Sequence, residues 1–309
     1  MVEQLPQDVI ARLRALDPAI TPELAQASWA LLTPFHEKLG YTAPRIVRDL
    51  RYGEHPRHRL DVHAGGEPAG SGDADHGTAG RGVPVFVFVH GGGFVAGDKH
   101  HAGTPTYDMV GAWAVRHGWV GVNMTYRYAP EAKWPAGAED VAAAVGWLRA
   151  NVAAYGGDPD RIIVAGNSAG ATHVADFAAG HGGDLAGVRG AALVSGIYTA
   201  RPAAAGSPPH PYYGVPDPVH ASLPCLVESH VPLLFGVAER DPERFQTAAA
   251  EVVAAWLARH GTVPNLVWMD GHNHMSAIGS LGVDEAVLGV PLARFIERHT
   301  GLFLIREIS

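Results

Sequence analysis

Cysteine and charge are both scarce in this sequence. Its 309 residues include a single cysteine, Cys225, and only 17% are charged, with a formal net charge of −8. One cysteine makes no internal disulfide, which suits a reducing cytoplasm, and with no base beside it we expect a small structural residue rather than a nucleophile. The chain also lacks the lysine and arginine runs that attract phosphate backbones, so we expect no nucleic-acid partner.

Long apolar runs are missing as well. No segment reaches the roughly 18 to 20 uninterrupted apolar residues of a membrane span. The chain begins MVEQLPQD, without the basic start and apolar core of a secretory signal, although a leader removed beforehand would leave no trace. We therefore expect a cytoplasmic protein that does not bind membranes.

The apolar residues, 47% of the chain, are arranged as short runs that alternate with helical segments from residue 83 onward. This alternation is typical of βαβ units that build a parallel sheet covered on both faces. The expected strands are residues 46–52, 58–63, 83–89, 119–125, 161–165, 191–196, 232–237 and 265–269. The expected helices between them are residues 138–155, 169–180, 242–259 and 283–299. The sequence thus predicts an α/β fold with a mostly parallel eight-stranded sheet.

Three segments do not fit the alternation. Residues 6–39 predict two helices, residues 64–82 are small and polar and predict a mobile loop, and residues 199–230 are rich in proline and aromatic side chains. We expect one catalytic domain, residues 46–309, with residues 199–230 as a cap insertion. Residues 1–45 are expected to form an N-terminal helical cap segment.

The pentapeptide GNSAG, residues 166–170, fits the pattern G-x-S-x-G. It follows an apolar run and precedes a helical segment, which is the strand-turn-helix context in which such a serine is a nucleophile. A sharp turn exposes the serine oxygen at the carboxyl edge of the sheet, close to a helix N-terminus that favours developing negative charge. Ser168 is therefore the candidate nucleophile.

A glycine run, HGGGF at residues 90–94, follows the strand predicted at 83–89. Backbone amides in such a run stabilise the oxyanion formed when a carbonyl is attacked, because they need no rearrangement during the reaction. We expect the donors to be Gly92, Gly93 and Ala169. His90 is expected to orient the loop, and phosphate binding is disfavoured because no GK[ST] follows.

An acid and a base follow the serine in the order Ser, Asp/Glu, His. Asp241 is the preferred acid because it stands where the strand at 232–237 leads into a helix, and Glu239 is the alternative. His274 is the preferred base, because Met275 and Ser276 follow it as an apolar step back into the fold, and His272 is the alternative. The two histidines could also bind a metal, but no further ligands complete a metallohydrolase pattern, so we expect no metal.

At these residues the chain resembles the hormone-sensitive-lipase-like carboxylesterases of the α/β-hydrolase superfamily and the related kynurenine formamidase-like and feruloyl-esterase-like hydrolases. The resemblance spans about residues 51–298 and includes HGGGF, YRYAPE, WP, GDPDR and GNSAG, in the family's order. It implies Ser168, Asp241 and His274 as the triad, with Gly92, Gly93 and Ala169 as oxyanion donors. Asn167, where the family often has an acid, and Met275, where it often has Gly-Phe, are more similar to the formamidase and feruloyl branch.

The sequence therefore predicts a serine carboxylic ester hydrolase that acts through an acyl-enzyme on short-chain or aromatic esters, without a cofactor. An aryl formamidase of the same fold is the alternative, and a catalytically inactive ligand receptor is the alternative of another class. The expected substrate-binding residues are Phe94, Trp134, Tyr212, Tyr213 and Met275. The oligomeric state stays open, a homodimer included.

Overall fold

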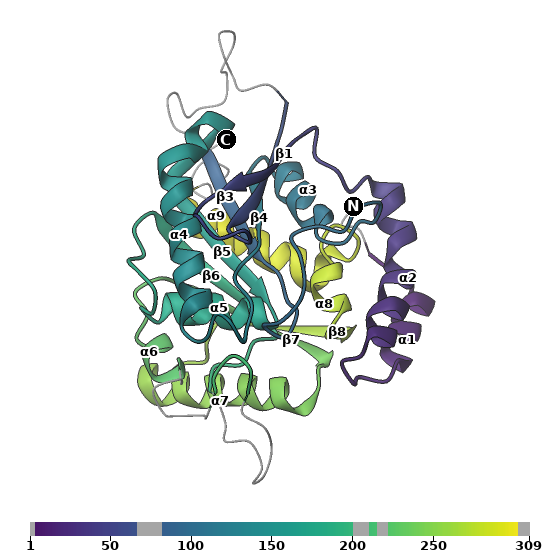
Figure 1. Ribbon diagram of the computed structural model, residues 1–309. Coiled ribbons are helices and arrows are strands. Elements are labelled where there is room, and N and C mark those ends of the chain that lie inside the picture. Colours follow the sequence, from purple (N-terminus) through teal and green to yellow (C-terminus); the bar gives the residue numbers. More distant parts are fainter. Residues whose placement is uncertain (1–3, 67–81, 200–209, 215–221, 302–309) are drawn as a thin grey trace.

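The computed structural model describes residues 4–66, 82–199, 210–214 and 222–301. Within these ranges eight strands form one sheet in the order β1-β2-β4-β3-β5-β6-β7-β8, with helices on both of its faces (Figure 1). The strands are β1 Arg45–Arg51, β2 Arg59–Ala64, β3 Val83–Val89, β4 Val120–Met124, β5 Gly157–Asn167, β6 Val188–Val194, β7 Leu233–Arg240 and β8 Leu266–Asn273. The predicted α/β fold with a mostly parallel eight-stranded sheet is confirmed.

The direction of the strands follows from their composition. From β4 to β8 neighbouring strands run parallel, whereas β2 is antiparallel to both β1 and β4. The parallel strand β3 and the second half of β5, residues 162–167, are buried, and β3 consists mainly of valine and phenylalanine, as strands covered by helices on both sides require. Their carboxyl ends meet at one edge of the sheet, where the loops that follow β3, β5, β7 and β8 come together.

The helices divide into two layers and an N-terminal pair. They are α1 Gln7–Ala15, α2 Pro22–Leu39, α3 Asp108–Arg116, α4 Ala136–Asn151, α5 Ala169–Ala178, α6 Leu223–Leu226, α7 Glu243–His260, α8 Ser276–Gly279 and α9 Val290–Thr300, with a 3₁₀ turn at Val152–Tyr155 and a π turn at Glu285–Gly289. One apolar core lies between the sheet and α4, α5 and α7, and a second lies between the other face and α3, α8 and α9. No helix in the described ranges has the length and apolar character needed to cross a membrane.

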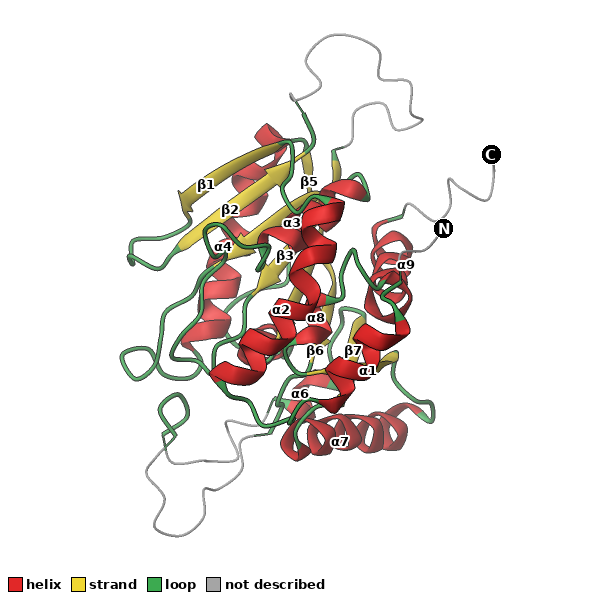
Figure 2. Cartoon of the chain, turned by 90° about the vertical axis from the view of Figure 1, so that its right-hand side faces the viewer, coloured by secondary structure: helices red, strands yellow, loops and turns green. Residues whose placement is uncertain are grey.

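The predicted N-terminal helices are present as α1 and α2. Thr21 caps α2 by accepting a hydrogen bond from the Leu24 N–H at 3.2 Å, and Gly40 ends it with a φ of 82°. α1 packs against β8 and α2 against α8, on the right-hand side of the molecule in Figure 1, which faces the viewer in Figure 2. Their apolar residues form a separate small core that includes Leu13 and Leu32.

The structure differs from the prediction at several helices, among them the short α8, which the sequence analysis did not predict. Residues 108–116 form α3, which the sequence analysis did not predict, and the helix predicted at 283–299 begins as a π turn and is α-helical from Val290 only. Most of the loop predicted at residues 64–82 and most of the cap predicted at 199–230 lie outside the described residues. Their predicted roles therefore stay predictions.

Candidate active site

Ser168 occupies the tight turn between β5 and α5. Its backbone has φ 57° and ψ −123°, a conformation that a non-glycine residue adopts only where the surroundings impose it. A Cβ on Gly166 would lie 2.4 Å from the backbone of Gly170, and one on Gly170 would lie 2.1 Å from the carbonyl oxygen of Val89. Both glycines are thus required by close backbone approach, and they leave Ser168 half-buried at the carboxyl edge of the sheet.

Three side chains form a hydrogen-bonded chain at this turn, here named the Ser168 array: Ser168, His274 and Asp241. His274 Nε2 lies 2.9 Å from Ser168 Oγ, and His274 Nδ1 lies 2.6 Å from Asp241 Oδ1. Because a carboxylate can only accept, Nδ1 carries the proton and Nε2 is left as an acceptor toward the serine hydroxyl. The imidazole is therefore oriented to take a proton from Ser168.

Asp241 is held on its other side as well. Its Oδ2 accepts hydrogen bonds from Ser195 Oγ at 2.6 Å and from the Ala238 N–H at 2.8 Å. Both Asp241 and His274 are buried, and the ring of Phe245 packs on the imidazole with centroids 4.2 Å apart. A carboxylate with several donors and a packed imidazole cannot easily turn away from the serine, so the array is fixed before any substrate binds.

The structure places the alternative acid, Glu239, elsewhere. Its Oε2 accepts hydrogen bonds from Arg14 Nε at 2.9 Å and from the Gly271 N–H at 2.6 Å. The guanidinium of Arg14 and this amide N–H hold the pKa of Glu239 below its usual value. Glu239, which lies in β7, thus joins α1 to β8.

The alternative base, His272, belongs to a second array, here named the Ser276 array: Ser276, His272 and Asp284. His272 Nδ1 lies 3.1 Å from Ser276 Oγ, and His272 Nε2 lies 3.2 Å from Asp284 Oδ2. All three side chains are buried. His272 and His274 therefore bind different carboxylates, which is not the arrangement of two ligands to one metal.

The glycine loop after β3 passes directly over Ser168. Gly92 and Gly93 have φ of 136° and 61°, and a Cβ on Gly91 would lie 3.2 Å from the Cβ of Ser168. Within the described chain, the N–H groups of Gly92 and Gly93 make no hydrogen bond. Ala169 N–H is the first of α5, where no preceding helical turn supplies an acceptor. Three amides without a helical or loop partner therefore surround the serine.

His90 lies beneath the glycine loop rather than in the Ser168 array. Its Nδ1 lies 2.6 Å from the carbonyl oxygen of Gly91, and its ring stacks on Tyr126 with centroids 4.5 Å apart. Burial lowers the pKa of His90 to about 4, so the imidazole is neutral at pH 7. Its contacts fix the backbone of the loop.

Comparisons with known proteins identify the fold. The family BD-FAE matches residues 75–187, and the structure is similar to an esterase from Pyrobaculum calidifontis with a TM-score of 0.65 and 22% identity over 96% of this chain and 98% of that one. It is also similar to EstE1, a carboxylesterase from a metagenomic library, with a TM-score of 0.61 and 24% identity over 92% of this chain and 99% of that one. The chain has the α/β-hydrolase fold. The resemblance found in the sequence is confirmed at this level.

Curated relatives match part of this chain. The esterase LipQ of Mycobacterium tuberculosis is 38% identical over 142 residues, which are 46% of this chain and 31% of LipQ. The esterase LipC of the same organism is 34% identical over 170 residues, 52% of this chain and 40% of LipC. The matched part of this chain therefore spans less than half the length of these relatives.

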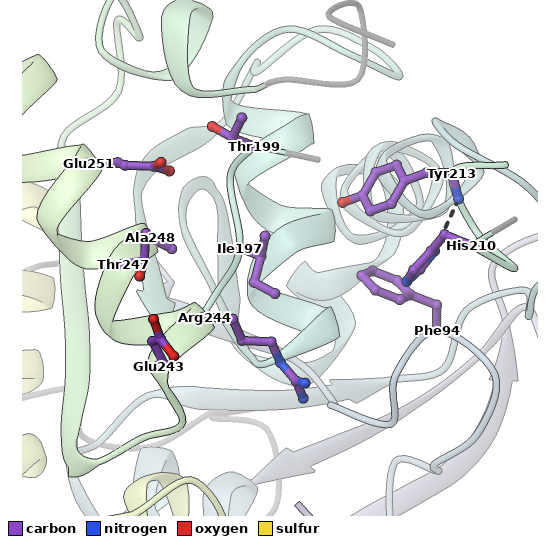
Figure 3. Close-up of a pocket in the computed structure, with 10 residues that line it drawn as sticks. All are labelled: Phe94, Ile197, Thr199, His210, Tyr213, Glu243, Arg244, Thr247, Ala248 and Glu251. Atoms are coloured by element: carbon purple, nitrogen blue, oxygen red, sulfur yellow. Dashed lines mark hydrogen bonds between the residues drawn. The ribbon is translucent and has the colours of Figure 1, made fainter. Parts of the chain in front are cut away.

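A cavity of about 550 Å³ opens next to the glycine loop. Its walls come from the loop after β6, from α7 and from the aromatic segment at residues 210–214; its lining residues are Phe94, Ile197, Thr199, His210, Tyr213, Glu243, Arg244, Thr247, Ala248 and Glu251. Figure 3 shows Phe94 and Tyr213 facing the side chains of α7 across this space. Two of the five predicted substrate-binding residues, Phe94 and Tyr213, therefore line the cavity.

The other three predicted substrate-binding residues lie outside this lining. Tyr212 is buried behind Phe94, with the two rings parallel and 4.5 Å apart, and Trp134 packs on the same aromatic cluster. Met275 follows His274 at the start of α8. Tyr212 and Trp134 therefore pack in the cluster that supports Phe94. Tyr212 would influence a ligand only by positioning the ring of Phe94.

One group of buried ligand-type side chains lies apart from this site. Asp61, His63 and Asp108 bring a potential metal-binding atom each within 4.8 Å of one another. Arg48 already binds both carboxylates, at 2.7 Å and 2.6 Å, and Lys99 lies 3.2 Å from Asp61. Lys99 also binds Asp49, at 2.8 Å, so that two cations are shared among three carboxylates, and the cluster is an ion-pair network that fastens β1 and β2 to α3.

The sequence analysis did not identify three residues that contact the array or the turn that carries His274. They are Ser195 and Phe245, described above, and Asn273, the last residue of β8. Ser195 stands at the end of a predicted strand, on the same sheet edge as Ser168, and that position was the available signal. The contacts of Phe245 and Asn273 join segments far apart in the chain, and no local pattern predicts them.

Proposed function

We propose that this chain is a serine carboxylic ester hydrolase that acts through an acyl-enzyme on short-chain or aromatic esters. The observation that carries the proposal is the Ser168 array, with 2.9 Å between Ser168 Oγ and His274 Nε2 and 2.6 Å between His274 Nδ1 and Asp241 Oδ1. The position of Ser168 on a positive-φ turn beside the glycine loop supports the same role. An inactive receptor would have no need of a complete array.

The geometry supports a two-step reaction. His274 Nε2 takes the proton of Ser168 Oγ while that oxygen attacks the ester carbonyl, and the amides of Gly92, Gly93 and Ala169 bind the resulting oxyanion. The tetrahedral intermediate then expels the alcohol, which receives the proton from His274, and an acyl-serine remains. A water molecule attacks this ester in the same way, with His274 again taking and returning a proton, and releases the acid and free Ser168.

Substrate size and character are supported by the cavity. A volume of about 550 Å³ lies within the range of small-molecule sites, and Phe94 and Tyr213 offer ring faces on one wall. Phe94 directly follows Gly93, so a substrate whose carbonyl oxygen meets the glycine loop brings its neighbouring group to this ring. An aromatic or short acyl or alcohol group fits such a wall better than a long flexible chain.

The names of the relatives support hydrolysis of esters. LipQ and LipC are named esterases, and EstE1 is named a carboxylesterase. A formamidase would use the same array, because attack on a formyl carbonyl needs the same nucleophile, base and amides. The two activities differ in the leaving group and therefore must be separated by substrate tests.

Covalent labelling and a substrate panel test the proposal. A fluorophosphonate should add one phosphonyl group to the wild-type chain and none to Ser168→Ala, as measured by intact mass. p-Nitrophenyl esters of graded chain length and N-formyl aromatic amides should then be compared by kcat/KM, with the esters expected to be hydrolysed faster. An unlabelled wild-type chain that hydrolyses nothing in the panel would favour the receptor alternative, and faster hydrolysis of the formamides would favour the formamidase.

A further inference from the structure

The segment that carries His274 contacts the N-terminal helices at three places: upstream of the histidine, at its neighbour Asn273, and downstream of it. Before it, Arg14 of α1 binds Asp270 at 2.9 Å and also binds Glu239, which accepts from the Gly271 N–H. After it, His36 Nε2 of α2 lies 2.9 Å from the carbonyl oxygen of Gly279 in α8. The base is therefore carried by a segment whose two ends both contact residues outside the hydrolase sheet.

The contact at the histidine itself is made by its neighbour Asn273. Asn273 Oδ1 accepts hydrogen bonds from the N–H groups of Met275 and Ser276, each at 3.0 Å, and so closes the turn that contains His274. Its Nδ2 lies 3.1 Å from Ser28 Oγ of α2 and donates to the Leu13 carbonyl oxygen of α1 at 3.4 Å. Asn273 and Ser28 are fully buried, so water cannot replace these bonds.

We propose that Asn273 is a positioning residue for His274, and that α1 and α2 act through it to set the place of the base relative to Ser168 and Asp241. Its Oδ1 closes the turn and also lies 3.2 Å from Ser28 Oγ, which can donate to it, and its Nδ2 joins the turn to both N-terminal helices. The role rests on the proposed function, since it gives His274 the part of the base.

This role differs from the cap predicted for residues 1–45. Among the described residues, the cavity beside Phe94 is lined by none from α1 or α2. The contacts of the helices lead instead to the ends of β7 and β8 and to α8, through Arg14, Ser28 and His36. Changes at this interface should therefore alter kcat, and they should leave KM and the order of preferred substrates unchanged.

The chain offers variants that separate the two ends of the amide. Asn273→Ala removes both the Oδ1 acceptor and the Nδ2 donor. Asn273→Asp keeps an acceptor for the N–H groups of Met275 and Ser276 but removes the donor to Leu13. Ser28→Ala removes only the hydroxyl on α2 and should fold even where Asn273→Ala does not. Val9→Ala is the matched control, because Val9 is buried in the same N-terminal core and has no polar contact with the loop.

Steady-state kinetics with p-nitrophenyl acetate, well below the unfolding temperature, form the first measurement. A misplacement of about 1 Å costs on the order of 10²-fold in rate, so Asn273→Ala should lower kcat by about that factor with KM within twofold. Asn273→Asp should recover part of this loss, Ser28→Ala should lose a few-fold, and Val9→Ala should keep the wild-type kcat despite a lower stability.

The second measurement does not depend on turnover. The proton shared by His274 Nδ1 and Asp241 over 2.6 Å should give a downfield ¹H resonance, which should be lost in Asn273→Ala and kept in Val9→Ala. If the wild-type chain hydrolyses none of the esters, the proposed function fails while this resonance still tests the positioning role. A folded Asn273→Ala that keeps the resonance, or a Val9→Ala that loses as much kcat as Asn273→Ala, would overturn the role.

Discussion

Two serine–histidine–aspartate arrays lie side by side in this molecule, and their histidines are only two residues apart in the chain. In both, the imidazole bridges a hydroxyl and a carboxylate at hydrogen-bond distance. They differ in the serine. Ser168 is half-buried on a positive-φ turn beneath free amides, whereas Ser276 is fully buried and its oxygen accepts the Asn273 N–H at 2.9 Å.

The comparison shows that residue types and hydrogen bonds do not make a nucleophile. An attacking oxygen needs access to a carbonyl group and donors where the oxyanion will form, and only the Ser168 array has both. The Ser276 array uses the same groups to fix the loop that carries His274. One array is thus proposed to react, and the other supports the geometry of the first.

The histidines should give the largest contrast. His274→Ala removes the proposed base and should lower kcat on the order of 10⁶-fold, the loss typical of removing a member of a complete triad. His272→Ala should keep kcat within about tenfold but lower the free energy of unfolding, because buried Ser276 and Asp284 lose their partner. Ester kinetics and urea unfolding of both variants measure the two effects. The reverse pattern of activity would show that His272 is the base.

Matched changes of the two aspartates should also differ in their effect on kcat, by a smaller factor than the two histidine changes. Asp241→Asn keeps the shape of the side chain but no longer favours the tautomer with a proton on His274 Nδ1, so kcat should fall about 10⁴-fold. Asp284→Asn, the matched change in the Ser276 array, should leave kcat within about threefold and reduce stability. Equal losses of kcat would mean that the two arrays do not have separate roles, and a large loss from Glu239→Gln alone would point to the rejected acid.

The sequence predicted the sheet and the members of the Ser168 array because these depend on local patterns. Apolar runs mark the strand ends, and parallel strands bring Ser168, Asp241 and His274 to one edge. It could not choose firmly between His272 and His274, because that choice depends on which partner each imidazole meets. Asn273 was missed for the same reason, since its partners lie about 245 and 260 residues away in the chain.

The helix α3 was missed for a local reason. Seven of its nine residues are buried, so it has no polar face whose spacing would reveal a helical period. It also begins after Tyr107, which is in a left-handed conformation and provides no side-chain cap. A helix that is enclosed on most sides is recognised from its packing, which the sequence alone does not display.

Acid should lower the free energy of unfolding by protonating His36, which joins α2 to the segment after His274. This is the smallest of the three expected effects. Burial lowers the pKa of His36 to about 4, against about 6.5 in the unfolded chain. The unfolded state therefore binds the proton first as the pH falls, and stability is lost between about pH 6.5 and pH 4. At roughly 1.4 kcal/mol for each pKa unit, His36 accounts for about 3 kcal/mol of that loss. His36→Gln keeps a donor for the Gly279 carbonyl without titrating, so its unfolding free energy should depend less on pH over this range. Urea unfolding at several pH values measures the slope, and a variant with the wild-type slope would show that His36 does not couple α2 to the loop in acid.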